Sequence, residues 1–162
     1  MTAWGEWLAW LEKTPLPSAI RESLWLYPAV ETAHIVGFVI LVGAAAMFDL
    51  RLLGVSRHLP VDTAARHLLP WSRASLLLVV PTGLMLFLTD ATATWANPAF
   101  RLKMILLGCA GANAWLFHRF TFRTVAAWNL DRPTPARARG AALASLLFWT
   151  GVISCGRLIA YF

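Results

Sequence analysis

Apolar residues fill four long stretches of this chain, and most charged residues gather in the connections between them. A membrane-spanning helix needs roughly 20 mostly apolar residues, and each stretch is of that length. The polar interruptions place the spans at about 28–48, 71–90, 99–120 and 140–161. Short connections keep consecutive spans antiparallel. We therefore expect an all-α, integral membrane four-helix bundle, with residues 1–162 forming a single membrane domain.

The N-terminal part has a different pattern. Trp4, Trp7 and Leu11 recur at helical spacing, on the face opposite Glu6. Tryptophan rings favour the head-group level of a bilayer. We therefore expect residues 1–26 to be an interfacial segment that contains a short amphipathic helix lying along the membrane surface.

Two prolines shape the predicted spans. Pro81 lies in the middle of span 71–90 and removes a backbone donor, so we expect that helix to bend there. Gly83 permits close packing on the inner side of the bend. Asn97 followed by Pro98 is a helix-start signal for the third span.

Composition agrees with a membrane class. The chain is 59% hydrophobic and only 14% charged, with a mean hydropathy of +0.62, which is far from an ordinary soluble domain. The formal net charge is +6, but no nucleic-acid-binding motif accompanies it, so we expect no nucleic-acid partner. The basic residues indicate contact with anionic lipid head groups.

The placement of lysine and arginine predicts the orientation. The positive-inside rule assigns the arginine-rich connections after the first and third spans to the cytoplasm and both termini to the outside. The basic residues of these two connections are Arg51, Arg57, Arg66, Arg119, Arg123, Arg132, Arg137 and Arg139.

His34 is the most informative single residue. An ionisable side chain in an apolar span is costly unless it is neutral, paired or bound to a ligand. His34 follows Pro28 at a depth of about 9 Å, and Lys103 follows Pro98 at about 7 Å, if each helix rises 1.5 Å per residue from the outer face. Two such side chains on neighbouring helices can face each other.

A buried lysine is driven toward its neutral amine, which can ligate a metal. We therefore predict that His34 and Lys103 hold the iron of a haem b, with Arg101 or Arg157 meeting the propionates. Glu31 is expected to orient the imidazole or to face the aqueous boundary. Two alternatives stay open: Lys103 extends to the surface, and His34 serves packing alone.

A second candidate pair lies toward the cytoplasmic side. His118 closes the third span and His67 precedes the second, so they can form a bis-histidine pair with Arg73 or Arg119 nearby. A histidine at the membrane edge, however, needs no special partner. Asp49 lies at a similar depth, and we expect it to form a structural ion pair with Arg73.

Copper would require soft ligands at matched depths. Cys109 and Cys155 are isolated from each other, and the methionines form no ladder. We expect both cysteines to be buried small hydrophobes.

Three stretches resemble small bacterial membrane proteins of the HemJ and CopD type. Residues 33–35 (AHI) and 49–54 (DLRLLG) resemble parts of their first span, and residues 97–107 (NPAFRLKMILL) are similar to the start of a later helix. His118 resembles the histidine that closes that helix. The likeness covers the first three spans and implies an uncharacterised bacterial family of four-span proteins within this group.

The resemblance carries functional expectations. HemJ-type proteins are haem b-containing protoporphyrinogen oxidases in which a histidine and a lysine are implicated in haem ligation, which implies those roles for His34 and Lys103. CopD-type proteins are associated with copper import and resistance. The resemblance also implies the bacterial inner membrane as the location.

Three functions follow as expectations. The first is a membrane-embedded haem b-binding protein that acts in electron transfer or in a membrane oxidoreductase. The second is copper import or resistance of the CopD type, and the third is a non-catalytic structural subunit of a membrane complex. The expected partners are the lipid bilayer, a redox partner or other subunits of a membrane complex, and a second copy of the chain.

Overall fold

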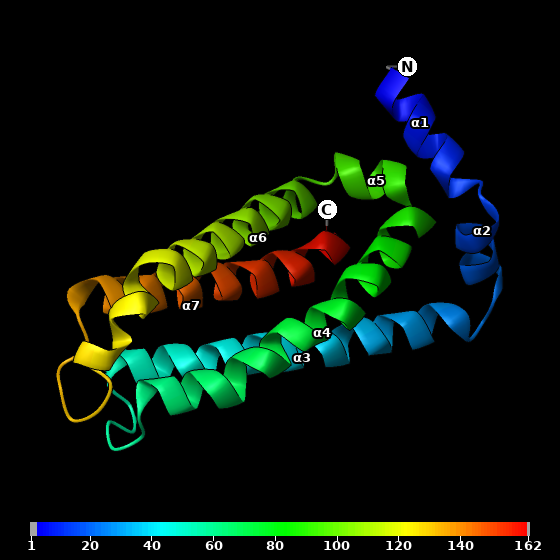
Figure 1. Ribbon diagram of the computed structural model, residues 1–162. Coiled ribbons are helices and arrows are strands. Elements are labelled where there is room, and N and C mark those ends of the chain that lie inside the picture. The colour runs from blue at the N-terminus through cyan, green and yellow to red at the C-terminus, as the bar shows by residue number, and fades with distance from the viewer. Residues whose placement is uncertain (1–2, 162) are drawn as a thin grey trace.

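The computed structural model describes residues 3–161, and within that range every regular element is helical (Figure 1). The all-α class is thereby confirmed. The elements are α1 (Ala3–Glu12), α2 (Pro15–Glu22), α3 (Leu26–Leu53), α4 (Val61–Thr89), α5 (Ala91–Ala96), α6 (Pro98–Leu116), the π-helix η1 (Phe117–Thr121), the 3₁₀ helix η2 (Phe122–Ala127), α7 (Ala136–Leu158) and the 3₁₀ helix η3 (Ile159–Tyr161).

The long helices pack as antiparallel neighbours. α3 lies along α4, α6 lies along α7, and α3 also contacts α7. Figure 1 shows α1, α2, α5 and η3 at one end of the molecule, which we call the terminal end. The α3–α4 and α6–α7 connections lie at the opposite end, the loop end. α4 and α6 meet at the terminal end, where the rings of Phe87 and Phe100 stack with centroids 5.3 Å apart.

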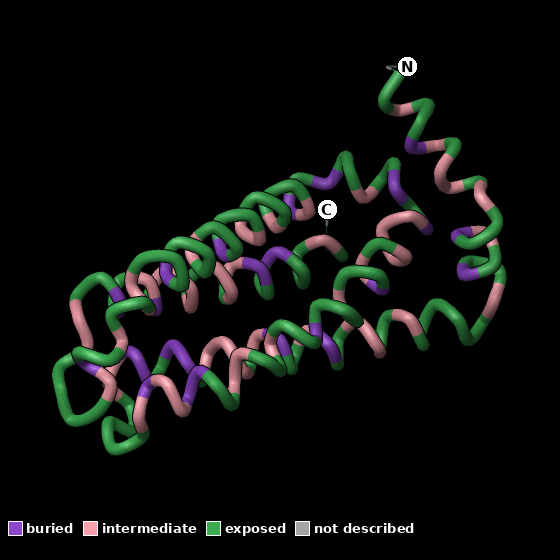
Figure 2. The backbone as a smooth tube through the Cα atoms, viewed as in Figure 1, coloured by how far each residue is buried: buried purple, intermediate pink, exposed green. Residues whose placement is uncertain are grey.

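Three helical segments are long and apolar enough to cross a membrane, namely Leu26–Leu53, Val61–Thr89 and Ala136–Tyr161. Much of their surface is exposed (Figure 2), and it includes large apolar side chains such as Leu77 and Leu147, which are 83% and 71% exposed. Such a surface suits lipid rather than water. The structure therefore indicates a membrane protein. α6, which carries Arg101 and Lys103, is not among these three segments.

α4 begins at Val61, well before the predicted start of that span near residue 71. Its first turn is capped from a distant part of the chain. Asn129 accepts the backbone N–H of Val61 with its carbonyl (3.0 Å) and that of Asp62 with its side-chain oxygen (2.9 Å). These bonds satisfy donors that the start of a helix otherwise leaves unpaired. The segment that the sequence analysis placed in a connection is therefore helical.

α3 continues past residue 48 to Leu53 and ends in a left-handed cap. Gly54 has φ +109°, which favours glycine, and its N–H donates to the carbonyl of Arg51 (3.1 Å). The N–H of Val55 donates to the carbonyl of Leu50 (3.0 Å). Together these bonds satisfy the last carbonyls of the helix.

The principal buried cluster lies at the loop end, where both helix pairs meet the connections. The buried guanidinium of Arg51 joins this cluster to the loops, donating to the carbonyls of Leu59, Arg57 (3.1 Å) and Asn129 (3.4 Å). The members of the cluster are Phe48, Leu52, Val61, Ala64, Ala65, Phe117, Trp128, Ala138 and Ala142.

The α6–α7 connection is more structured than the sequence indicated. The regular part of α6 ends at Leu116, and the chain continues as a π-helical turn and then as the 3₁₀ helix η2. Phe117 and Phe122 of these turns both pack against Phe48 of α3, with ring centroids 5.8 and 6.4 Å away. These aromatic contacts hold the connection against α3.

The terminal end is held by polar contacts and aromatic rings. Glu12 accepts the backbone N–H of Thr92 (2.6 Å), which ties α1 to α5, and the rings of Trp4 and Trp95 lie 5.7 Å apart across the same contact. Arg21 of α2 donates to the backbone carbonyls of Glu12 (2.9 Å) and Thr89 (2.7 Å). The carbonyl of Thr89 lies at the C-terminus of α4, where a cation is favourable.

α4 runs without interruption through Pro70 and Pro81. Figure 1 shows that its second half, in brighter green, turns away from α3 toward α5. Pro81 belongs to this second half, where its ring and missing N–H weaken the helical hydrogen-bond ladder.

Candidate functional site

His34 lies in the first half of α3 and packs against the second half of α4. Its Nδ1 is 3.1 Å from the carbonyl oxygen of Val79 and 3.0 Å from Oγ1 of Thr82. Gly83 makes room for the ring, because a Cβ at that position would lie only 2.9 Å from Cε1 of His34. The glycine that the sequence analysis singled out for close packing therefore contacts the candidate histidine directly.

The hydrogen bonds fix which nitrogen of His34 carries the proton. A carbonyl oxygen can only accept, so Nδ1 must donate to Val79. The hydroxyl of Thr82 donates to the carbonyl of Leu78 (2.6 Å), which leaves its oxygen free to accept from Nδ1 as well. Nε2 therefore carries the lone pair of the neutral ring. A backbone carbonyl that holds Nδ1–H in this way is typical of metal-ligating histidines.

Lys103 approaches the interior from α6. Its side chain is half-buried, and its Nζ lies 3.8 Å from the position that a Cβ on Gly156 of α7 would occupy. Within residues 3–161 the ion pair between Arg66 and Asp62 stands alone, so no carboxylate neutralises Lys103.

An aromatic contact extends the environment of His34 toward α7. The imidazole stacks on Phe38 one turn further along α3, with ring centroids 6.5 Å apart. Phe38 in turn meets Trp149 of α7 edge to face at 6.0 Å. The histidine therefore has a polar contact on α4 and an apolar one on the side of α7.

Among the described residues, the others predicted around this site form no hydrogen bond with His34 or Lys103. Glu31 is exposed, and the bond that orients the imidazole comes from α4 instead. Arg101 is exposed on the first turn of α6. Arg157 donates to the hydroxyl of Tyr161 (2.8 Å) and lies over that ring at 5.1 Å.

His67 and His118 are both exposed and bonded to their own helices. His67 Nδ1 is 2.9 Å from the carbonyl of Thr63, and His118 Nδ1 is 2.9 Å from that of Ala114. Each bond links a residue to the one four positions earlier, and the His118 ring also stacks on Phe122 at 5.6 Å. These local bonds orient both rings within their own helices, so neither orientation requires a ligand shared by the two histidines.

Asp49 does not form the predicted ion pair with Arg73. Arg73 is exposed and donates to the carbonyl of Leu69 (3.3 Å). Asp49 is buried in α3 beside Ser145 of α7, and its Oδ2 has no hydrogen-bond partner. No local pattern indicates this burial, because Asp49 stands beside Leu50 and Arg51 at the predicted end of a span.

The described part of the chain contains no group of three or more histidine, cysteine, aspartate or glutamate side chains able to hold a metal ion. Cys155 is buried as expected, but Cys109 is exposed on α6. The two thiols therefore do not share one environment. His34, packed against α4, and Lys103, beside Gly156 of α7, are the partly buried nitrogen donors among the predicted ligands.

Comparison with known proteins gives one match. A family model described as "Family of unknown function (DUF6644)" covers residues 24–162. No curated protein and no solved structure matches the chain.

Proposed function

The chain belongs to this family of unknown function, and from the geometry of its own residues we propose that it is a membrane-embedded haem b-binding protein. It acts in electron transfer or as part of a membrane oxidoreductase. The observation that carries the proposal is the bond from His34 Nδ1 to the carbonyl of Val79, because it would leave the lone pair of Nε2 free to hold haem iron.

Lys103 is proposed as the second ligand. Haem iron accepts nitrogen ligands, and a lysine amine without a carboxylate partner would be a suitable donor once it is neutral. His34 on α3 and Lys103 on α6 belong to different helix pairs, so a planar group held between them would bridge the two pairs. The haem would supply one-electron redox chemistry, and the chain would supply the ligands and an apolar surrounding.

We propose four membrane spans, with α6 as the fourth helix alongside the three apolar ones. α6 has 19 residues, which is about 28 Å of helix and close to the thickness of a hydrocarbon core. Its partly buried Lys103 faces the neighbouring helices, as polar residues in membrane helices usually do. The loop end, which carries most of the arginines, is cytoplasmic, and both termini are outside in a bacterial inner membrane.

The exposed tryptophans agree with a chain that spans the bilayer, because they lie toward both ends of the helices. Trp4, Trp7 and Trp25 lie at the terminal end, and Trp71 and Trp115 belong to the halves of α4 and α6 nearer the loop end. Tryptophan is enriched at both membrane interfaces. We propose that α1 lies along the outer interface, where its rings meet the head groups.

Topology is tested by single-cysteine labelling in a background without Cys109 and Cys155. A cysteine placed at Arg132 should react with a membrane-impermeant maleimide only after the membrane is opened, and one placed at Trp10 should react in intact spheroplasts. Reaction at residue 132 from the outside of intact cells would reverse the orientation.

Haem binding is tested on protein purified in detergent from a host that makes haem. The wild type should show a Soret band and stoichiometric iron, and His34→Ala should abolish both. Lys103→Met should shift the band, because one axial ligand changes while the other remains.

His118→Ala is the matched control, since His118 makes the same kind of Nδ1 bond to a carbonyl but lies exposed at the loop end. It should leave the spectrum unchanged. A full, unshifted band in His34→Ala would reject the ligand assignment. A wild type without haem, but with bound copper, would instead favour the CopD-type function.

A further inference from the structure

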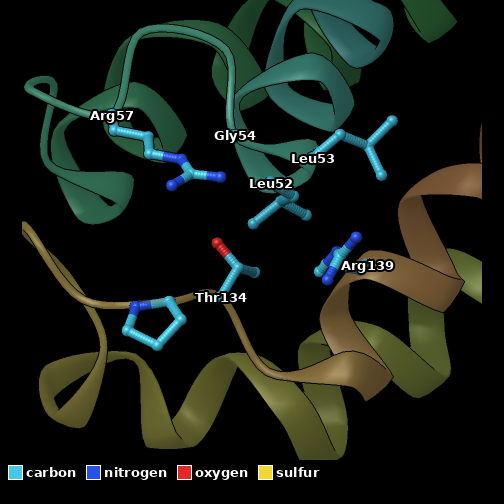
Figure 3. A pocket seen from close by; sticks show the side chains of 7 residues that line it. Leu52, Leu53, Gly54, Arg57, Thr134 and Arg139 are labelled. Carbon is cyan, nitrogen blue, oxygen red and sulfur yellow. The ribbon is translucent and has the colours of Figure 1, made fainter.

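A small pocket at the loop end lies between the C-terminus of α3 and the N-terminus of α7 (Figure 3). Its volume is about 50 Å³, several times the space that one water molecule requires. Leu52 and Leu53 form its apolar side. Figure 3 shows Arg57, Thr134 and Arg139 placed around the remaining space, with the guanidinium of Arg57 and the hydroxyl of Thr134 directed toward each other.

Neither arginine of this pocket is neutralised within the protein. Across residues 3–161 the structure contains one ion pair, Arg66 with Asp62 at 3.1 Å, and it involves neither Arg57 nor Arg139. Both residues are exposed, so solvent or a ligand can reach them. Asp131, the acid of the neighbouring loop, is also exposed and makes no ion pair with either of them.

The backbone at the end of α3 directs Arg57 into the pocket. A Cβ at Gly54 would lie 2.9 Å from Nε of Arg57, so the side chain folds over the glycine. The carbonyls of Leu50 and Arg51 already accept the N–H groups of Val55 and Gly54. Arg57 is therefore not needed as a helix cap, and its donors stay available.

The other side of the pocket adds partial positive charge. α7 begins after Pro135 and has no side-chain cap, so its first N–H groups are directed toward the loop. Thr134 lies immediately before this cap, and Arg139 lies in the first turn. The buried guanidinium of Arg51 donates to the backbone carbonyl of Arg57 (3.1 Å).

We propose that this pocket binds a phosphate group. Two guanidinium forks and a hydroxyl match the oxygens of a tetrahedral anion, and arginine is the residue best suited to bidentate phosphate contacts. The pocket lies where the apolar length of α3 ends, which is the level of lipid phosphates for a helix that crosses the bilayer. The phosphate belongs to a lipid head group or to a free anion. This inference does not depend on haem binding.

Binding is measured on the full-length protein in a neutral detergent, as the thermal stabilisation caused by each ligand at constant ionic strength. The probes are short-chain phosphatidylglycerol, short-chain diacylglycerol as the phosphate-free lipid, inorganic phosphate, and chloride. The apparent affinity of wild type for a phosphate-containing probe should be at least about tenfold higher than that of the double variant Arg57→Gln/Arg139→Gln.

Arg119→Gln/Arg123→Gln is the matched control, because it removes the same charge from the same end of the molecule but outside the pocket. It should bind as wild type does. Thr134→Val tests the hydroxyl, and Arg57→Lys/Arg139→Lys keeps the charge while removing the forks, so both should weaken binding.

The two sources of phosphate give different results. Arginine-dependent stabilisation by phosphatidylglycerol alone assigns the pocket to lipid, and arginine-dependent stabilisation by inorganic phosphate assigns it to a free anion. Equal responses of wild type and Arg57→Gln/Arg139→Gln, or an equal loss in the control variant, would overturn the proposal, since general electrostatic attraction would then account for the effect.

Discussion

The contact between His34 and Gly83 gives a sharp test of how α3 packs on α4. In Gly83→Ala the new methyl group would lie 2.9 Å from Cε1 of the imidazole, which is too close for two carbon atoms. The ring cannot simply rotate away, because Nδ1 is held by the carbonyl of Val79 and by Thr82. The substitution must therefore displace the ring or separate the two helices.

The change in the free energy of unfolding of Gly83→Ala is the balance of opposing effects. Overpacking in a close contact costs about 1–3 kcal/mol, and weakening the bonds to Nδ1 costs about 0.5–1.5 kcal/mol more. Replacing glycine by alanine within a helix stabilises the helix by up to about 1 kcal/mol. Gly43→Ala on α3 isolates this last effect, because a Cβ at Gly43 would meet nothing within 4 Å. The propensity gain cancels in this comparison, so we expect Gly83→Ala to be about 1.5–4.5 kcal/mol less stable than Gly43→Ala.

The free energy of unfolding is measured by titrating dodecyl sulfate into mixed micelles and following tryptophan fluorescence. Both variants are read in the same experiment, so the difference between their midpoints reports the contact. Equal midpoints for Gly83→Ala and Gly43→Ala would refute the close packing of His34 on α4.

Other predictions concern residues away from this contact. Asp49→Leu should stabilise the protein by about 1–3 kcal/mol in the same unfolding assay, because it removes a buried carboxylate oxygen that has no partner. Arg51→Met should destabilise it by about 2–4 kcal/mol and make the α3–α4 connection sensitive to protease, because three carbonyls lose their donor. The pKa of Glu12 lies below its usual value because the N–H of Thr92 donates to its carboxylate. The stabilisation that Glu12 gives to the α1–α5 contact is therefore complete above the ordinary pKa of about 4.5. It is lost as the pH falls through the lowered pKa. The wild type should show an acid transition in tryptophan fluorescence that is missing in Glu12→Gln. The loss of the Glu12–Thr92 bond should change the free energy of unfolding by less than about 1 kcal/mol, because the contact is exposed. Pro81→Ala should straighten α4, which spin-label distances between the terminal-end halves of α3 and α4 would detect as a shortening.

Residues that act within their own helix were predictable from the sequence. The apolar runs gave the class of protein and three long helices, and counting from Pro28 and Pro98 placed His34 and Lys103 at comparable depths. This count relies on the nearly constant rise of a helix, and the comparable depth of the two residues stays a prediction. Gly83 was likewise identified as a site of close approach, although the sequence could not show that His34 is the group that approaches it.

Features that depend on distant contacts were not predictable. The first turns of α4 look like a connection in the sequence, since charged residues interrupt them, and they are helical because Asn129 caps them from far along the chain. The π-helical turn after Leu116 arises from packing against Phe48 rather than from any local signal. Asp49 was assigned to an ion pair because depth alone cannot tell which face of a helix a side chain occupies.

The uneven distribution of burial has a consequence for motion. The principal buried cluster joins both helix pairs at the loop end, whereas the terminal end is held by a few polar contacts and aromatic rings. Local opening is easiest where few apolar side chains are buried. Amide protons of α3 and α4 should therefore exchange slowly near the loop end and faster toward the terminal end. We therefore expect the helix pairs to part first at the terminal end, which is the end nearer His34, while the buried cluster keeps the loop end closed.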